Sequence, residues 1–163
     1  MNRLSLLLLI LLFMTVNLAG QAAPQVPAAN PEDFSGMYSF VREGEFLQIT
    51  VEDKGNVTGF ISRYGDLDSD RGVFLDQFFK KASTDGTKLE FTTEQKHGVW
   101  FEFSGTVGRG EGKTLADEGF WVVKGKLTRY ATDAHNKVSA QSREVVMKSF
   151  PQDAALGSSQ PRD

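Results

Sequence analysis

The distribution of proline limits what this chain can fold into more than any other feature of its sequence. All five prolines lie outside residues 32–150, three before this stretch and two after it. Proline has no backbone N–H to donate to a β-ladder, so a long segment without proline suits a continuous sheet. We therefore expect the central segment to be β-structure and both flanks to lie outside it.

Between residues 34 and 150, hydrophobic and polar residues alternate over short runs. Leu47, Ile49 and Val51 share one face of such a run, and alternation with period two buries one face of a strand. Turn sequences such as Asp85-Gly86 separate the runs. The pattern predicts eight strands, at residues 37–42, 47–51, 57–64, within 73–82, 88–94, 99–107, 120–130 and 138–150.

The strand within residues 73–82 has a helical alternative. Its hydrophobic residues recur at helical spacing, namely Phe74, Leu75, Phe78 and Phe79. We expect a strand, because the hairpin turn at Asp85-Gly86 needs one before it. The fold class is therefore all-β, an antiparallel meander of about eight strands. Such a meander can close into a barrel, which we expect here, and a two-sheet β-sandwich is the alternative.

Residues 1–22 have the features of a secretory signal peptide. Arg3 gives a basic start, residues 4–16 are almost wholly apolar, and small residues follow them. This apolar run is shorter than the roughly 20 residues that a transmembrane helix needs. We expect cleavage near Ala23, export to the periplasm or the extracellular space, and no stable membrane anchor afterwards. The remaining divisions expected are an Ala/Pro-rich linker at 23–33, a β-barrel domain at 34–150 and a disordered tail at 151–163.

Composition excludes several classes of protein. The chain has no cysteine, so it can form neither a disulfide nor a lipidated N-terminal cysteine, and its stability must come from core burial. Lys and Arg number 18 and Asp and Glu 21, and the basic residues are scattered. A nucleic-acid-binding domain would show a clustered basic face, so we expect no nucleic-acid partner.

The acidic segment from Asp66 to Asp70 is the sharpest local motif. Asp66, Asp68 and Asp70 alternate as do the first ligands of an EF-hand calcium loop. The match then fails, because Arg71 stands where glycine is needed and Gln77 where a bidentate glutamate is needed. We therefore expect a solvated acidic loop, with calcium binding as the alternative, and we assign no metal site.

No residue carries a recognisable catalytic or cofactor motif. His97 and His135 both fall in expected turns without a partner at metal-ligand spacing, so we expect solvent-exposed histidines. No G-x-S-x-G occurs, and the glycine-rich stretch 108–113 lacks the spacing of a phosphate-binding loop. We expect no cofactor and no catalytic residues.

The aromatic residues are the best candidates for a ligand site. A barrel of eight strands is just wide enough either to fill with side chains or to hold one small ligand. The residues expected to line such a cavity are Trp121, Tyr38, Tyr64 and Phe103. The alternative is that these aromatic side chains simply fill the core.

Several short segments are similar to streptavidin-type barrels: Gly36-Met37-Tyr38, Asn56-Val57-Thr58-Gly59, Phe103-Ser104-Gly105 and Trp121-Val122-Val123. Together they span most of the body, which thereby resembles the calycin group of up-and-down barrels, including lipocalins and avidins. It is also similar to small exported β domains of environmental bacteria that have no assigned function. The resemblance implies a lipocalin-like barrel.

The biotin-binding positions of the avidins do not carry over. Ser39-Phe40 stands where that group has an asparagine after the first aromatic residue, and Ile61 and Arg63 replace the expected tyrosine and serine. Trp121 alone remains. The lipocalin G-x-W is also absent, since Tyr38 stands in place of tryptophan.

From the sequence we therefore expect an exported, non-enzymatic protein that binds a small apolar or amphipathic molecule inside its barrel. The alternative is an interaction or structural β module of the cell envelope that has no internal ligand. The sequence names no protein partner for either function.

Overall fold

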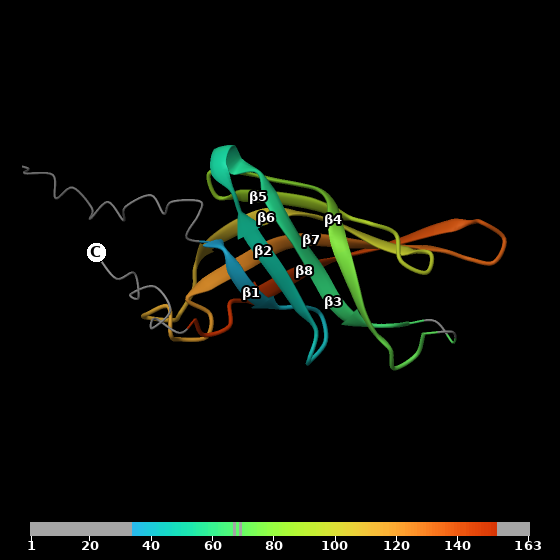
Figure 1. The fold of residues 1–163 in the computed structure, drawn as a ribbon, viewed down its shortest axis with the longest axis horizontal. Helices are drawn as coiled ribbons and strands as arrows, with labels where there is room; N and C mark the ends of the chain where they lie inside the picture. The colour runs from blue at the N-terminus through green and yellow to red at the C-terminus, as the bar shows by residue number, and fades with distance from the viewer. Residues whose placement is uncertain (1–33, 67, 69, 153–163) are drawn as a thin grey trace, which may run out of the picture.

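The computed structural model describes residues 34–66, 68 and 70–152, and these form an eight-stranded antiparallel meander (Figure 1). Each strand pairs with the next one along the chain, so a single sheet curls into a barrel. The strands are β1 (Gly36–Ser39), β2 (Phe46–Val51), β3 (Val57–Tyr64), β4 (Phe74–Asp85), β5 (Lys88–Thr93), β6 (Val99–Arg109), β7 (Trp121–Thr132) and β8 (Val138–Lys148). The all-β barrel expected from the sequence is confirmed, and two stacked sheets are not what forms.

The signal peptide at 1–22, the linker at 23–33 and residues 153–163 of the tail lie outside the described residues. Over the part that is described, no helix has the length and hydrophobicity that a membrane crossing requires. A short 3-10 turn, η2 (Asp53–Gly55), joins β2 to β3.

Alternation along the strands produces the barrel wall. In β6, Val99, Phe101 and Phe103 are buried, whereas Trp100 and Glu102 on the other face are not. β4 is a strand and not a helix, because β3 and β5 pair with its two halves and supply the backbone partners. A register shift between Phe79 and Lys81 bends it where the pairing passes from β3 to β5.

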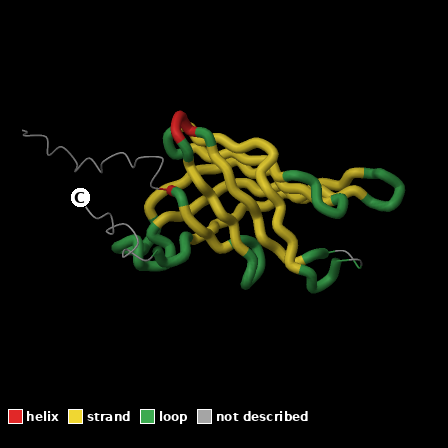
Figure 2. Tube along the Cα trace, in the orientation of Figure 1, coloured by secondary structure: helices red, strands yellow, loops and turns green. Residues whose placement is uncertain are grey.

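The connections gather at the two ends of the barrel (Figure 2). Strand direction alternates in a meander, so successive connections also alternate between the ends. We call one end the mouth end; it carries the connections at 40–45, 65–73, 94–98 and 133–137. The opposite end carries Phe34, Gln152 and the connections at 52–56, 86–87 and 110–120.

The barrel closes at a short seam between β1 and the segment that ends β8. Tyr38 and Ser149 form an isolated antiparallel bridge, and the Phe150 N–H donates to the Met37 carbonyl at 2.8 Å. The Ser39 hydroxyl oxygen accepts a hydrogen bond from the Lys148 N–H at 3.0 Å. Because β1 has four residues and β8 has eleven, β1 can cover only a small part of the β8 edge.

Side chains fill the interior through much of its length. One cluster of buried hydrophobic residues draws on strands all round the barrel. Phe91 stacks between Phe79 and Phe103, with ring centroids 4.6 and 5.1 Å apart. Burial of such large aromatic surfaces supplies the stability that a cysteine-free domain of this size requires. The hollow part of the barrel lies at the mouth end.

Candidate functional site

A pocket of about 300 Å³ opens at the mouth end of the barrel. Its lining combines four arginines and two carboxylates with a hydrophobic wall. The lining residues are Phe40, Val41, Arg42, Glu45, Arg63, Asp66, Phe101, Arg129, Gln141 and Arg143. We call this the arginine pocket. Four cations and two anions leave two positive charges in excess, so the pocket is suited to an anionic group.

Asp66 holds three of the arginines together from the loop between β3 and β4. Its Oδ1 lies 3.1 Å from Arg42 Nη2. Its Oδ2 lies 3.3 Å from Arg63 Nη1 and 3.1 Å from Arg129 Nη2. Since these arginines come from β3, β7 and the β1–β2 connection, one carboxylate ties three separate parts of the barrel into one site.

Glu45 fixes Arg42 from the same connection. Its carboxylate is almost wholly buried and lies 2.7 Å from Arg42 Nη2. It also accepts a hydrogen bond from the Tyr64 N–H at 3.1 Å, so it satisfies a backbone donor of β3. The hydrogen bond to Glu45 raises the pKa of the Arg42 guanidinium. Arg42 is therefore held in place as a permanent cation at the rim.

Arg63 is the most buried cation of the pocket, with a side chain 2% exposed. Its Nε donates to Gln77 Oε1 at 2.6 Å and its Nη1 to the Tyr64 carbonyl at 2.9 Å. Its Nη2 is buried and has no hydrogen-bond partner among the described residues. Burial lowers the pKa of this guanidinium, and the charge of Asp66 opposes that effect. An arginine nevertheless remains protonated in proteins, so Arg63 is a buried cation with an unused donor.

Gln77 of β4 holds Arg63 from behind. Its side-chain amide donates to the carbonyls of Glu94 and Val99, each at 2.9 Å, while its oxygen accepts from Arg63. In the sequence, Gln77 stands out only as a residue that fails the calcium pattern. Its role in the structure is to position the buried arginine.

β8 adds the outer wall of the pocket. Arg143 and Gln141 pair in register with Leu127 and Arg129 of β7, and both are exposed. Phe40 and Phe101 pack edge to face at 5.6 Å on the hydrophobic side. Arg63 also lies over the Phe101 ring, 5.5 Å from its centroid. The pocket thus presents cationic donors beside an aromatic wall.

The three carboxylates of the acidic loop lie against different arginine or histidine side chains. Asp66 bonds the arginines described above, Asp68 pairs with Arg71 at 2.5 Å, and Asp70 lies 2.8 Å from His97 Nδ1. Among residues 34–66, 68 and 70–152, no three His, Asp or Glu side chains are grouped as metal ligands would be. His97 is exposed, as expected from the sequence, and its contact with the buried Asp70 joins the acidic loop to the β5–β6 turn.

Three of the four aromatic residues expected to bind a ligand lie in one buried core cluster, and the fourth lies outside it. Tyr38, Phe103 and Trp121 belong to the buried core, where Tyr38 donates its hydroxyl hydrogen to the Phe34 carbonyl at 2.6 Å. Trp121 packs edge to face against Phe34 at 4.9 Å. Tyr64 lies on the outside of the barrel and is 40% exposed. The structure places none of the four in the lining of the arginine pocket.

The arginine pocket has no contiguous motif, because its residues come from β3, β6, β7, β8 and two connections. One signal in the sequence could have indicated it. Arg63 and Arg129 occupy inward-facing positions, two residues after the buried Ile61 and Leu127. A charged residue where alternation calls for a buried side chain is an exception with a structural or functional cause.

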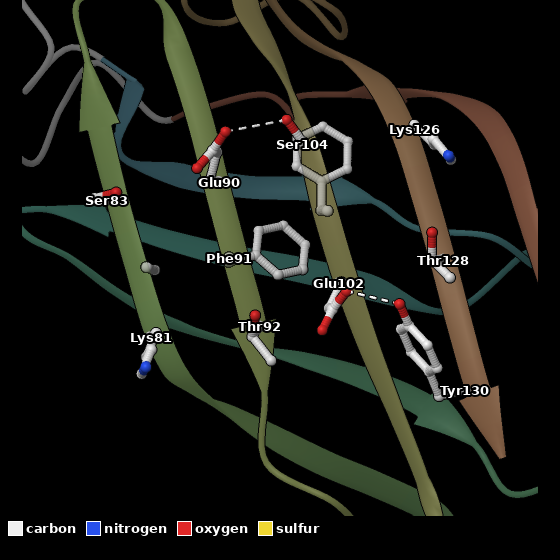
Figure 3. Close-up of a pocket in the computed structure, with 12 residues that line it drawn as sticks. Lys81, Ser83, Glu90, Phe91, Thr92, Glu102, Ser104, Lys126, Thr128 and Tyr130 are labelled. Atoms are coloured by element: carbon white, nitrogen blue, oxygen red, sulfur yellow. Dashed lines mark hydrogen bonds between the residues drawn. The ribbon is translucent and has the colours of Figure 1, made fainter. Parts of the chain in front are cut away.

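A larger hollow of about 590 Å³ lies elsewhere, on the outer face of β4 to β7 (Figure 3). Outward-facing polar side chains surround it, and the buried Phe91 and Phe103 also line it. Its carboxylates bond to neighbours: Ser104 Oγ donates to Glu90 at 3.2 Å and the Tyr130 hydroxyl donates to Glu102 at 2.8 Å. That hydrogen bond raises the pKa of Tyr130. These are ordinary contacts of a solvated sheet face. The arginine pocket, where buried charge meets a hydrophobic wall, is the stronger candidate site.

No protein-family model matches this sequence, and no curated protein matches it. Solved structures do share its fold. Rhizavidin aligns with a TM-score of 0.55 at 10% identity, over 72% of this chain and 83% of that one. The rhizavidin–biotin complex aligns with a TM-score of 0.53 at 10% identity, over 71% of this chain and 99% of that one. The chain therefore has the fold of an avidin-type, calycin-like up-and-down barrel, as the sequence resemblance implied.

Proposed function

We propose that this protein is an exported, non-enzymatic binding protein for a small amphipathic molecule, which it holds in the arginine pocket. The observation that carries the proposal is the juxtaposition of the buried Arg63 with the aromatic wall of Phe40 and Phe101 at an open barrel mouth. Ligand sites in proteins combine an apolar wall with a few fixed polar groups in this manner.

The arrangement favours binding over catalysis. Both carboxylates of the pocket, Glu45 and Asp66, are engaged by arginines. A general acid or base must be free to exchange a proton with its substrate, and these two instead fix the positions of cations. The pocket is therefore organised for recognition by charge and shape.

The fold supports the same class of function. Rhizavidin, which shares this fold, forms a complex with biotin, so an avidin-type barrel can hold a small molecule. Of the biotin-contacting positions expected from the sequence resemblance, only Trp121 is retained here. We therefore carry over small-molecule binding and not biotin itself.

Native mass spectrometry of residues 23–163, purified from a bacterial periplasm, tests the proposal. We expect an adduct that survives desalting and is lost on denaturation. Replacing Phe40, on the pocket wall, by serine should weaken retention of the adduct, whereas Val146→Ser on the exposed face of β8 should not. A bare protein mass, from cells and after incubation with a cell extract, would contradict the proposal.

Export has its own test. N-terminal sequencing of the protein recovered outside the cytoplasm should begin near Ala23. Recovery of an intact residue 1–22 segment on the mature protein would contradict export by a cleaved signal peptide.

One observation favours the alternative, an interaction module of the cell envelope. The outer face of β2, β3 and β4 carries a continuous aromatic cluster in which Phe60 packs against Phe46 at 5.9 Å and Phe78 at 5.5 Å. Phe74 continues it, and Phe74 and Phe78 are 44% and 55% exposed. Contiguous exposed apolar surface of this kind marks interaction sites.

Closed homo-oligomers are the commonest assemblies of soluble proteins, so a second copy is the partner to test on this face. Sedimentation velocity should then show a dimer for the wild type and a monomer for Phe74→Ser/Phe78→Ser. The double substitution Val138→Ser/Val146→Ser, at exposed hydrophobic residues of β8, is the matched control. A wild-type monomer throughout the concentration series would contradict self-association.

A further inference from the structure

The polar group that the arginine pocket recognises can be inferred from the hydrogen-bonding state of Arg63. Its Nη2 is buried without a partner among the described residues, while its Nε and Nη1 are both bonded. Buried polar groups in proteins nearly always have a hydrogen-bond partner, because leaving one unpaired is costly. An unused pair of N–H donors on a charged group calls for an acceptor, and a negatively charged oxygen is the strongest one.

The carboxylates of the described residues do not accept a hydrogen bond from Arg63 Nη2. Asp66 already pairs with Arg42, Arg63 Nη1 and Arg129. Glu45 pairs with Arg42 and accepts a hydrogen bond from the Tyr64 N–H. Arg143, exposed on the β8 side of the pocket, adds a fourth cation. The two positive charges in excess would repel a cationic ligand, and a neutral hydroxyl would leave them uncompensated.

Resting on the proposed function, we infer that the ligand of the arginine pocket carries an oxyanion head group, a carboxylate or a phosphate, on a hydrophobic body. The head group accepts hydrogen bonds from Arg63 Nη2 and pairs with Arg143. The hydrophobic body lies against the wall formed by Phe40, Val41 and Phe101. Asp66 holds Arg42, Arg63 and Arg129 in place when the ligand is absent.

A series of probes that differ only in head group tests the inference. Octanoate, octyl phosphate, octan-1-ol and octylammonium share one chain and present two anions, a neutral group and a cation. Their dissociation constants for residues 23–163 are measured by NMR titration of amide signals around the pocket. We expect at least one of the anions to bind about tenfold more tightly than octanol, because hydrogen bonds to charged groups are worth more than neutral ones. Octylammonium should bind least, and comparison of the two anions identifies the head group.

Arg143→Gln is the variant of choice, because Arg143 is exposed and its replacement leaves the buried network intact. It should weaken binding of the preferred anion about fivefold to tenfold and change octanol binding much less. Lys126→Gln, on the outer face of β7, removes an equal charge outside the pocket and should have no comparable effect. Raising the salt concentration should weaken anion binding by the wild type more than binding by Arg143→Gln.

Arg63 itself is best followed without mutation, since replacing it would disturb the core. Its guanidinium N–H signals should shift and exchange more slowly with water when the preferred anion is added. Equal affinity for octanol and both anions, with no effect of Arg143→Gln, would overturn the anion inference and leave the proposed function standing. Failure of all four probes to bind, the charged ones at about 10 mM and octanol near its solubility limit, would overturn the proposed function as well.

Discussion

Arg63 and Gln77 are joined inside the barrel by a 2.6 Å hydrogen bond from Nε to Oε1, and both side chains are almost wholly buried. The glutamine also bonds two carbonyls beyond β4, at Glu94 and Val99. One neutral side chain therefore connects the cation of the pocket to the turn between β5 and β6.

Replacing Gln77 by leucine should destabilise the fold by about 3 kcal/mol. The substitution leaves Arg63 Nε and two carbonyl oxygens without their partner, and each buried unpaired group costs about 1–3 kcal/mol, partly relieved by water at the open mouth. Urea unfolding measures the change. Gln95→Leu, an exposed glutamine of the same region, is the control and should shift stability by less than about 0.5 kcal/mol. Equal stability of the two variants would show that the Arg63–Gln77 link contributes nothing.

Tyr38→Phe should cost about 1–2 kcal/mol at pH 7, because the Phe34 carbonyl loses its buried donor. It should also change the response to alkali. Burial raises the pKa of Tyr38 above its ordinary value, so the unfolded chain releases this proton at a lower pH than the folded protein. The stabilisation is complete below about pH 10 and is lost as pH rises towards the folded pKa.

The measurement is the free energy of unfolding at intervals between pH 8 and pH 11. Wild-type stability should fall more steeply above pH 10 than that of Tyr38→Phe, by up to about 1.4 kcal/mol per pH unit. Tyr64→Phe, on the outer face, serves as the neutral-pH control and should change stability little. Parallel slopes for wild type and Tyr38→Phe would contradict the burial of this hydroxyl.

Trp121 should tolerate phenylalanine much better than alanine. Its ring packs between Phe34 and Phe120, and its Nε1 is buried with no hydrogen-bond partner in the described part of the chain. Trp121→Ala opens a cavity and should cost about 3–5 kcal/mol. Trp121→Phe keeps most of the aromatic contact and removes the unpaired N–H, so it should cost less than about 2 kcal/mol. Thermal unfolding followed by circular dichroism compares them, and similar losses for both would contradict this account of the Trp121 contacts.

A glycine pair fixes the spacing of β6 and β7. Gly105 and Gly125 face one another in register, and a Cβ on Gly125 would lie 2.5 Å from both the Gly105 Cα and the Ser104 carbonyl oxygen. Gly125→Ala should therefore destabilise the protein by about 2 kcal/mol, as forced overpacking does. Gly108→Ala, three residues farther along β6 where a Cβ meets nothing within 4 Å, is the matched control. Urea midpoints that move equally would contradict this account of the pair.

The sequence predicts the fold well because strands and turns are indicated by residues close together in the chain. Alternation at Leu47, Ile49 and Val51 and the turn at Asp85-Gly86 each depend on neighbours in the chain, and the structure has strands and a hairpin there. The strand within 73–82 is predicted correctly for the same reason. This strand, β4, ends at Asp85, in the Asp85-Gly86 turn from which the strand is predicted.

The candidate site is not predictable in the same way, because it depends on which strands meet around the barrel. Arg63 and Arg129 are far apart in sequence, and only closure of the sheet brings them to one carboxylate, Asp66. Tyr64 illustrates the converse. It is an aromatic residue on a correctly predicted strand, yet it follows the inward-facing Arg63 and so lies on the outer surface. The local pattern predicts which face of the sheet a residue lies on, but it does not predict which residues of other strands it contacts across the barrel.

The seam between β1 and the end of β8 determines where a surface or a fusion partner can be attached to this domain. Gln152 Nε2 donates to the Ser35 carbonyl at 3.0 Å, so the described chain enters and leaves the barrel at one corner. The arginine pocket opens at the opposite end, among the connections at 40–45 and 65–73. A surface, reporter or fusion partner joined directly at Phe34 or Gln152 would hold the barrel by the end opposite the pocket. Residues 34–152 can therefore be immobilised or rebuilt as a sensor through Phe34 or Gln152 without obstructing the pocket.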